Sequence, residues 1–321
     1  MSWTILFLMG LALMVLLEFK TSRPDGQLVR SIHPYRQLMP FVMKGRNESA
    51  FYYEADVPAE PILDYIDRGK KDHGFSFVHC SVAALGATLA KHPRLNQFIS
   101  GRRLYRRNGG YLTFSMKRKK LDNTSKIAVV KMRLSPEETF REFCERVDAK
   151  ITVERSNTET QADKEYKVYR SLPRPLLNLG VWLWKTLDYY NLLPGFLMES
   201  DGMYTSVFVA NLGSFKSEGG WHHLYEWGNC PIFIVLGMTR ERVVLEGGVP
   251  VSRKFIPIRI TLDERIDDGM TAQAGVETFR RIMSNPDRYL GSLAPDAPRF
   301  GFASPTVLDA MASPAKETEG A

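Results

Sequence analysis

The chain has 321 residues, of which 44% are hydrophobic and 25% charged, a composition typical of a folded protein with a sizeable core. This excludes a disordered or low-complexity chain and leaves room for one large domain or two small ones. The net charge of +7 is a modest basic excess, compatible with phosphates or anionic lipid but too diluted to indicate a nucleic-acid partner. The three cysteines, Cys80, Cys144 and Cys230, are far apart, so we expect no disulfides and a reducing compartment.

The N-terminal segment is the first expected element. Residues 3–17 carry no charge, and with the two residues before them they make a helix of about 25 Å, slightly short of a ~30 Å hydrocarbon core. The run has no polar face, which argues against a buried helix, and no basic residue precedes it, which argues against a secretory signal peptide. We therefore expect residues 1–20 to form a single membrane anchor. Basic residues follow the run, which predicts a cytoplasmic main body: Lys20, Arg23 and Arg30.

The body, residues 24–290, mixes helix and strand patterns without an internal repeat, and we interpret it as one domain. Apolar periodicity and capping signals predict helices at 76–91, 135–147 and 271–283. Short β-branched and aromatic runs predict strands at 204–210, 232–236, 243–246 and 255–262. Irregular alternation of these elements favours an α+β fold. Residues 291–321, rich in Ala, Pro, Ser and Gly, are expected to form a flexible tail.

Two segments leave alternatives open. Arginines within 102–107 and the basic residues 117–120 flank an apolar stretch, which fits either a hairpin with solvated charges or a patch facing phosphates or a membrane. Residues 172–198 pack tryptophans, tyrosines and a phenylalanine among leucines. Proline and glycine at both ends prevent one spanning helix, so this segment fits either an interfacial helix or a core or subunit-contact helix.

Four segments, read in order, resemble a known family. They are His92 to Asn96 after a helix, Asn211-Leu212-Gly213 after a strand, the strand 232–237, and the heptapeptide DERIDDG at 263–269. Together they resemble the catalytic core of dihydrolipoyl acyltransferases of 2-oxoacid dehydrogenase complexes and chloramphenicol acetyltransferase. The resemblance implies a sheet flanked by helices, assembly as a homotrimer, and an active site in a channel between subunits.

The resemblance also assigns roles at the site, and this chain departs from them. The family heptapeptide is DHRxxDG, whose histidine is the general base for attack on an acyl-coenzyme A thioester. Here that position is Glu264, whereas Arg265, Asp268 and Gly269 are retained. A family hydroxyl that donates to the tetrahedral oxyanion is replaced by Ala210. Loss of a base costs about 100- to 10,000-fold in rate, and loss of an oxyanion donor about 100- to 1000-fold.

Compensating groups are conceivable. A desolvated Glu264 could act as base, or the adjacent pair His222 and His223, after the Asn-Leu-Gly turn, could replace it. Against this, paired histidines are usually a polar loop or subunit contact, and Glu264 also fits a structural carboxylate that pairs with an arginine and holds the turn together. No metal site is expected, because the other histidines are dispersed at positions 33, 73, 79 and 92.

Three functions follow as hypotheses. The first is a membrane-tethered acyltransferase using coenzyme A thioesters, with Glu264, Asp268, His222 and His223 as catalytic candidates. The second is an inactive trimeric scaffold at the membrane, and the third a carrier of a lipid or acyl chain. The resemblance implies no lipoyl group on this chain, since the lipoyl-bearing domain of complex-forming relatives has no counterpart in the 321 residues.

Overall fold

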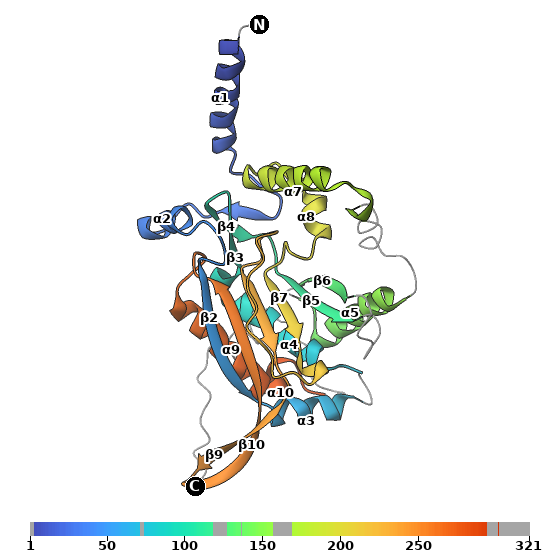
Figure 1. Cartoon of the computed structure of the whole chain (residues 1–321). Helices are drawn as coiled ribbons and strands as arrows, with labels where there is room; N and C mark the ends of the chain where they lie inside the picture. Colours follow the sequence, from blue (N-terminus) through green and yellow to red (C-terminus); the bar gives the residue numbers. More distant parts are fainter. Residues whose placement is uncertain are drawn as a thin grey trace.

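The computed structural model describes residues 3–70, 74–117, 127–135, 137–156, 169–293 and 301. Its largest element is a seven-stranded sheet in the order β2-β10-β8-β7-β5-β6, with β9 paired to β10 (Figure 1). The pairs β5–β7 and β7–β8 are parallel and the others antiparallel. The strands are β2 (Ala50–Pro58), β5 (Tyr111–Lys117), β6 (Ile127–Arg133), β7 (Val207–Asn211), β8 (Ile232–Leu236), β9 (Arg240–Glu246) and β10 (Val249–Asp263).

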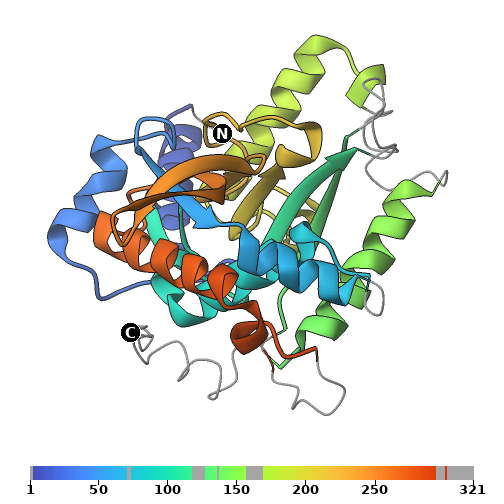
Figure 2. The same ribbon diagram turned by 90° about the horizontal axis from the view of Figure 1, so that it is seen from below.

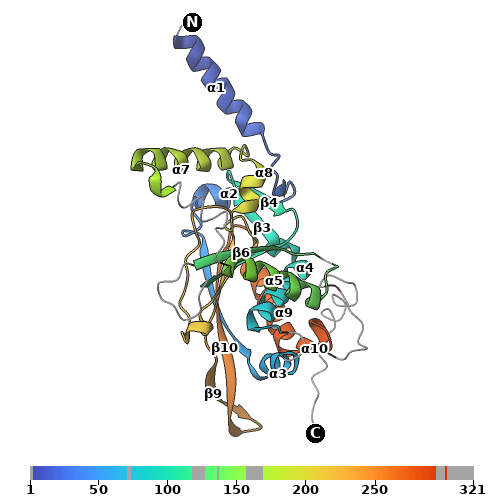
Figure 3. The ribbon, with the colours of Figure 1, turned by 90° about the vertical axis from the view of Figure 1, so that its right-hand side faces the viewer.

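Helices gather on one face of this sheet (Figures 2 and 3). The core lies between that face and α4 (Phe77–Lys91) and α9 (Gly269–Ser284), with further helices around them. Every residue from His79 to Leu89 is buried, which confirms the predicted core helix. The predicted α+β architecture is therefore confirmed. The further helices are α3 (Glu60–Gly69), α5 (Phe140–Arg155) and α10 (Pro286–Tyr289).

A second, smaller sheet lies at the end from which the N-terminal helix leaves (Figure 1). It has the order β1-β4-β3, formed by β1 (Gly26–Leu28), β3 (Gln97–Ser100) and β4 (Arg103–Arg107). Two short 3-10 helices lie in connections: η1 (Pro93–Asn96) joins α4 to β3, and η2 (Gly213–Phe215) follows β7 on the way to β8. Beside the small sheet lie three helices: α2 (Pro34–Val42), α7 (Arg174–Tyr189) and α8 (Gly195–Ser200).

The N-terminal helix α1 (Trp3–Phe19) projects from the body, and none of its residues is buried (Figure 3). It has 17 residues, a length of about 25 Å. Across the part of the chain that the structure describes, no helix combines the length and apolar character needed to span a bilayer. The predicted membrane-spanning anchor is therefore not found.

Several predicted boundaries differ from the structure. The helix expected from residue 135 begins at Phe140, because Thr139 caps it through a capping box with Glu142, and it ends at Arg155. Strand β10 begins before residue 255, because its first half pairs with β9 in a hairpin that projects from the sheet. The turn of that hairpin is Gly247-Gly248, both with positive φ. The expected flexible tail lies largely outside the described residues.

The two open segments are also settled in part. Residues 172–198 form α7 and α8 rather than one helix, and no residue of α7 is buried, so a core helix is wrong. The basic run does not form a hairpin, because β4 pairs with β1 and β3 in the small sheet whereas β5 pairs with β6 and β7 in the large sheet. Its Arg107 is buried rather than solvated and donates to the Asn229 side chain at 2.8 Å. Burial lowers the pKa of Arg107 to about 10. Residues 118–120 lie outside the described residues.

Candidate functional site

The heptapeptide joins the end of β10 to the start of α9, and its first carboxylate is structural. Asp263 accepts hydrogen bonds from Arg265 Nε at 2.8 Å and Nη2 at 2.7 Å, and both side chains are nearly fully buried. Ser49 Oγ donates to the same carboxylate at 2.9 Å. Arg265 also donates to the backbone oxygens of Met43 and Lys44. The pair thus fastens the end of β10 to the chain preceding β2.

The last two carboxylates are structural as well. Asp267 is buried and pairs with Arg94 at 2.6 Å and Arg36 at 3.3 Å. Asp268 is the N-cap of α9 and accepts from the Thr271 amide at 3.0 Å, a bond that lowers the pKa of Asp268. Gly269 begins the helix. Asp268 therefore shapes the backbone after the expected base position.

Glu264 is different from its neighbours. Its amide donates to the Ser49 oxygen at 2.9 Å, while the half-buried carboxylate makes no hydrogen bond or ion pair with any residue that the structure describes. The expectation that Glu264 pairs with an arginine is wrong, because Asp263 occupies Arg265 and Asp267 occupies Arg94. Among the described residues, no polar contact therefore fixes the side chain of Glu264.

The oxyanion position offers no donor side chain. Ala210 lies in β7 between Ser115 and Val235 of the neighbouring strands. The nearby hydroxyls are in use: Ser206 donates to Asn96 at 2.5 Å, and Ser214 donates to the Asn211 oxygen at 2.9 Å.

The turn that follows Ala210 does require its glycine. A Cβ on Gly213 would lie 2.6 Å from the Gly237 oxygen, and the Leu212 amide donates to the Leu236 oxygen. The Asn211-Leu212-Gly213 turn is therefore held against the end of β8 by close backbone packing.

The histidine pair packs on β8. The ring of His222 stacks on Phe233 with centroids 3.9 Å apart, and His223 stacks on His222 at 4.9 Å. His222 Nδ1 donates to the His223 oxygen at 2.7 Å, so a neutral ring keeps the lone pair of Nε2. Burial lowers the pKa of His222 and favours this neutral form. Within the described residues, no hydrogen bond joins Glu264 to either histidine.

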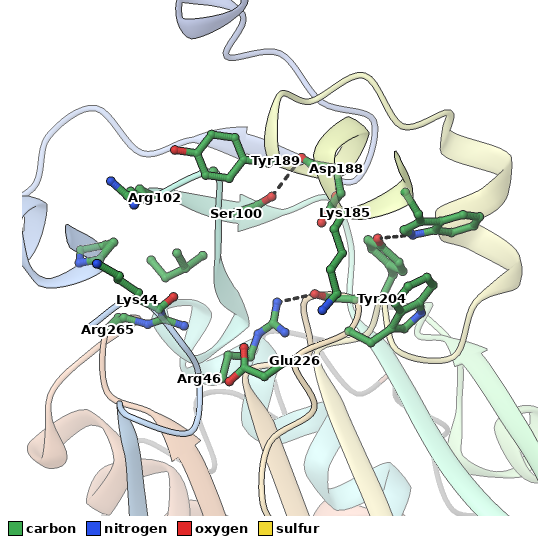
Figure 4. A pocket seen from close by; sticks show the side chains of 16 residues that line it. Lys44, Arg46, Ser100, Arg102, Lys185, Asp188, Tyr189, Tyr204, Glu226 and Arg265 are labelled. Carbon is green, nitrogen blue, oxygen red and sulfur yellow. Dashed lines mark hydrogen bonds between the residues drawn. The ribbon is translucent and has the colours of Figure 1, made fainter. Parts of the chain in front are cut away.

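A cavity of about 260 Å³ lies below α7 and beside α2 (Figure 4). It is bounded by the β3–β4 turn and by residues 226–228, and Arg265 connects it to the heptapeptide. One wall is aromatic: Trp184 stacks on Trp227 at 5.3 Å, and its Nε1 donates to the Tyr204 hydroxyl at 3.0 Å. The charged residues that line the cavity are Lys44, Arg46, Arg102, Lys185, Asp188, Glu226 and Arg265.

The charges in the cavity do not balance. Asp188 pairs with the buried Arg23 at 3.0 Å, and Glu226 accepts from the Asn47 amide and side chain. Lys44, Arg102 and Lys185 have no carboxylate partner among the described residues. We call these three side chains the cavity cations. All three are exposed, so they leave positive charge at the cavity that attracts an anionic ligand.

The β3–β4 turn is specialised for this cavity. Its two residues, Gly101 and Arg102, both have positive φ, +54° and +59°. A Cβ on Gly101 would lie 2.3 Å from the Tyr189 oxygen, so glycine allows the turn to touch the end of α7. A left-handed non-glycine residue such as Arg102 costs on the order of 1 kcal/mol, which makes this a strained position at the cavity.

This cavity is not predicted by the sequence. The basic run and the aromatic segment are each recognisable in the chain, but only the fold brings residues of both, Arg102 and Trp184 among them, to one cavity.

Comparison with known proteins identifies the fold. No family model matches the sequence, and no curated protein matches it. Among solved structures, a probable dihydrolipoamide acetyltransferase from Listeria monocytogenes is similar at 13% identity, with TM-score 0.54, over 83% of this chain and 97% of that one. The cubic core of a pyruvate dehydrogenase complex is similar at 11% identity, with TM-score 0.52, over 81% and 93%.

A third structure is the dihydrolipoamide acetyltransferase of Azotobacter vinelandii, studied for a serine, a histidine and an asparagine in its catalytic mechanism. It matches at 11% identity, with TM-score 0.52, over 81% of this chain and 93% of that one. This chain therefore has the fold of dihydrolipoamide acetyltransferase catalytic cores, as the sequence motifs predicted.

Proposed function

We propose that this protein is a trimeric, membrane-associated scaffold with the acyltransferase fold, in which the heptapeptide supports folding rather than catalysis. One observation carries the proposal: the aspartates of the heptapeptide make structural contacts. Asp263 and Asp267 form ion pairs with arginines, and Asp268 caps α9. With glutamate at the base position and Ala210 at the oxyanion position, two contributions to the family reaction are lost together.

The test is consumption of acyl-coenzyme A thioesters over a range of acyl chains, by the full chain and by Glu264→Gln. We expect no consumption above the blank for either protein. Thioester cleavage by the wild type that Glu264→Gln abolishes would overturn the proposal and make Glu264 the base. A double variant, Glu264→His with Ala210→Ser, serves as the arm that restores both family side chains.

A second candidate is acyl transfer with His222 as the general base. It is favoured by the Nδ1 hydrogen bond to the His223 oxygen, which leaves Nε2 able to accept a proton from a nucleophile. Here His222→Asn would abolish turnover, while His223→Asn, the matched control, would retain it. Because burial lowers the pKa of His222, the rate would rise with pH only below neutrality and stay level above it.

Assembly and membrane association are the remaining parts of the proposal. A homotrimer is supported by the likeness to the cubic core of the pyruvate dehydrogenase complex, and light scattering in mild detergent measures it. Association with a bilayer is supported by α1 and α7, in which no residue is buried. Vesicle flotation of the full chain against a chain lacking residues 1–19 measures the contribution of α1.

A further inference from the structure

Three helices near the end of the molecule that carries α1 (Figures 1 and 3) have exposed apolar side chains, and residues of α2 and α7 also line the cavity. Helix α7 lies across this end, and α2 and α8 lie next to it. We call the surface of these side chains the apolar end face. Its members include Leu38 (57%) and Val42 (69%) of α2, Leu179 (56%) and Trp182 (63%) of α7, and Phe196 (70%) of α8.

The cavity cations lie on or next to the helices of the apolar end face. Lys185 lies on α7 three residues after Trp182, and Lys44 follows α2. Arg102 lies with its guanidinium carbon 5.4 Å from the centre of the Phe41 ring of α2. Figure 4 shows the long Lys185 side chain extending into the cavity from α7. Positive charge and exposed apolar side chains are thus adjacent, as they are at surfaces that bind anionic bilayers.

We infer that the cavity binds the phosphate-bearing head group of a membrane lipid, while the lipid chains stay in the bilayer against α2 and α7. This inference rests on the proposed membrane association and names the ligand of that surface. The cavity cations supply the charge that a phosphate requires, and the indole pair Trp184 and Trp227 supplies a wall at head-group depth.

The size of the cavity supports a head group rather than a larger ligand. Pockets that enclose a drug-sized molecule measure about 300–1,000 Å³. The volume of about 260 Å³ is below that range, so the cavity suits a phosphate with a small polar group. The apolar end face alone would also suit a second copy of the chain. A second copy would bring the cavity cations of the two chains together, which like-charge repulsion disfavours.

The experiment measures binding of the full chain to phosphatidylcholine vesicles with and without phosphatidylglycerol. The variant is Lys44→Gln/Arg102→Gln/Lys185→Gln. The matched control removes the same number of exposed cations elsewhere: Lys70→Gln/Arg155→Gln/Lys216→Gln. Each basic residue near an anionic surface strengthens binding about fivefold, so we expect the cavity variant, which lacks three, to bind anionic vesicles on the order of 100-fold more weakly. We expect the control to change the affinity only a few-fold.

The outcomes separate the inference from the function on which it rests. If the wild type binds neither kind of vesicle, the proposed membrane association fails. If it binds but the cavity variant and the control behave alike, membrane association stands and the head-group site is overturned. A titration with soluble glycerophosphate is the last arm: binding as tight as to vesicles would assign the site to a free phosphate compound instead. All three side chains are exposed, so we expect the cavity variant to keep the melting temperature of the wild type. An unchanged melting temperature then shows that any loss of vesicle binding does not come from misfolding.

Discussion

Replacing Asp263 by asparagine tests whether the heptapeptide holds the fold. Asp263 and Arg265 are 1% and 3% exposed, and removing one partner of a buried ion pair costs about 3–5 kcal/mol. Arg265 keeps the backbone oxygens of Met43 and Lys44 as acceptors, so we expect the lower end, about 3 kcal/mol. At about 2–4 °C per kcal/mol for a domain of this size, the melting temperature falls by roughly 6–12 °C.

The matched variant is Glu264→Gln, one residue further along. Its carboxylate makes no hydrogen bond or ion pair with a described residue, so the free energy of unfolding changes by no more than about 0.5 kcal/mol. Equilibrium unfolding in urea measures both variants, with equal m values required for the comparison. If Glu264→Gln destabilises the protein as much as Asp263→Asn, the separation of structural and unconstrained carboxylates is refuted.

Three further predictions concern single positions. Gly101→Ala places a Cβ 2.3 Å from the Tyr189 oxygen, so we expect at least about 2 kcal/mol of destabilisation in urea unfolding, and an unchanged midpoint would contradict it. Gly213→Ala places a Cβ 2.6 Å from the Gly237 oxygen, so we expect a similar loss in the free energy of unfolding. A loss well below this value would show that the turn adapts and would contradict the prediction. Burial lowers the pKa of Lys131 to about 8, so the folded state releases this proton before the unfolded state does. The wild type should therefore gain stability relative to Lys131→Met, by roughly 2 kcal/mol, as pH rises from about 8 to 10, and a constant difference would refute this.

The core elements were predictable because local patterns determine them. The apolar stripe of α4 and the all-apolar run of β8 are buried along nearly their whole length, so their sequences carry the signal directly. The start of α5 was not predictable in the same way, because Ser135 and Thr139 are both capping residues and lie only four positions apart. Thr139 and Glu142 form the real capping box, and the burial of Phe140 and Phe143 fixes the helix there.

The chemistry of the basic run depended on tertiary contacts. Arg102 and Arg107 look alike in the sequence, yet one is exposed at the cavity and the other is buried. The difference comes from Asn229, which is far along the chain and accepts the Arg107 hydrogen bond. The cavity itself joins residues from distant segments, so no local pattern could indicate it.

The ion pairs of the heptapeptide have a consequence for how such motifs evolve. A chain that loses Asp263 or Arg265 loses stability whether or not it catalyses anything, so purifying selection would keep these residues after activity has gone. Glu264, which the fold does not require, is the position free to drift. In this chain, the aspartates and the arginine of the heptapeptide therefore reflect the demands of folding, and they carry no information on whether the chain catalyses a reaction.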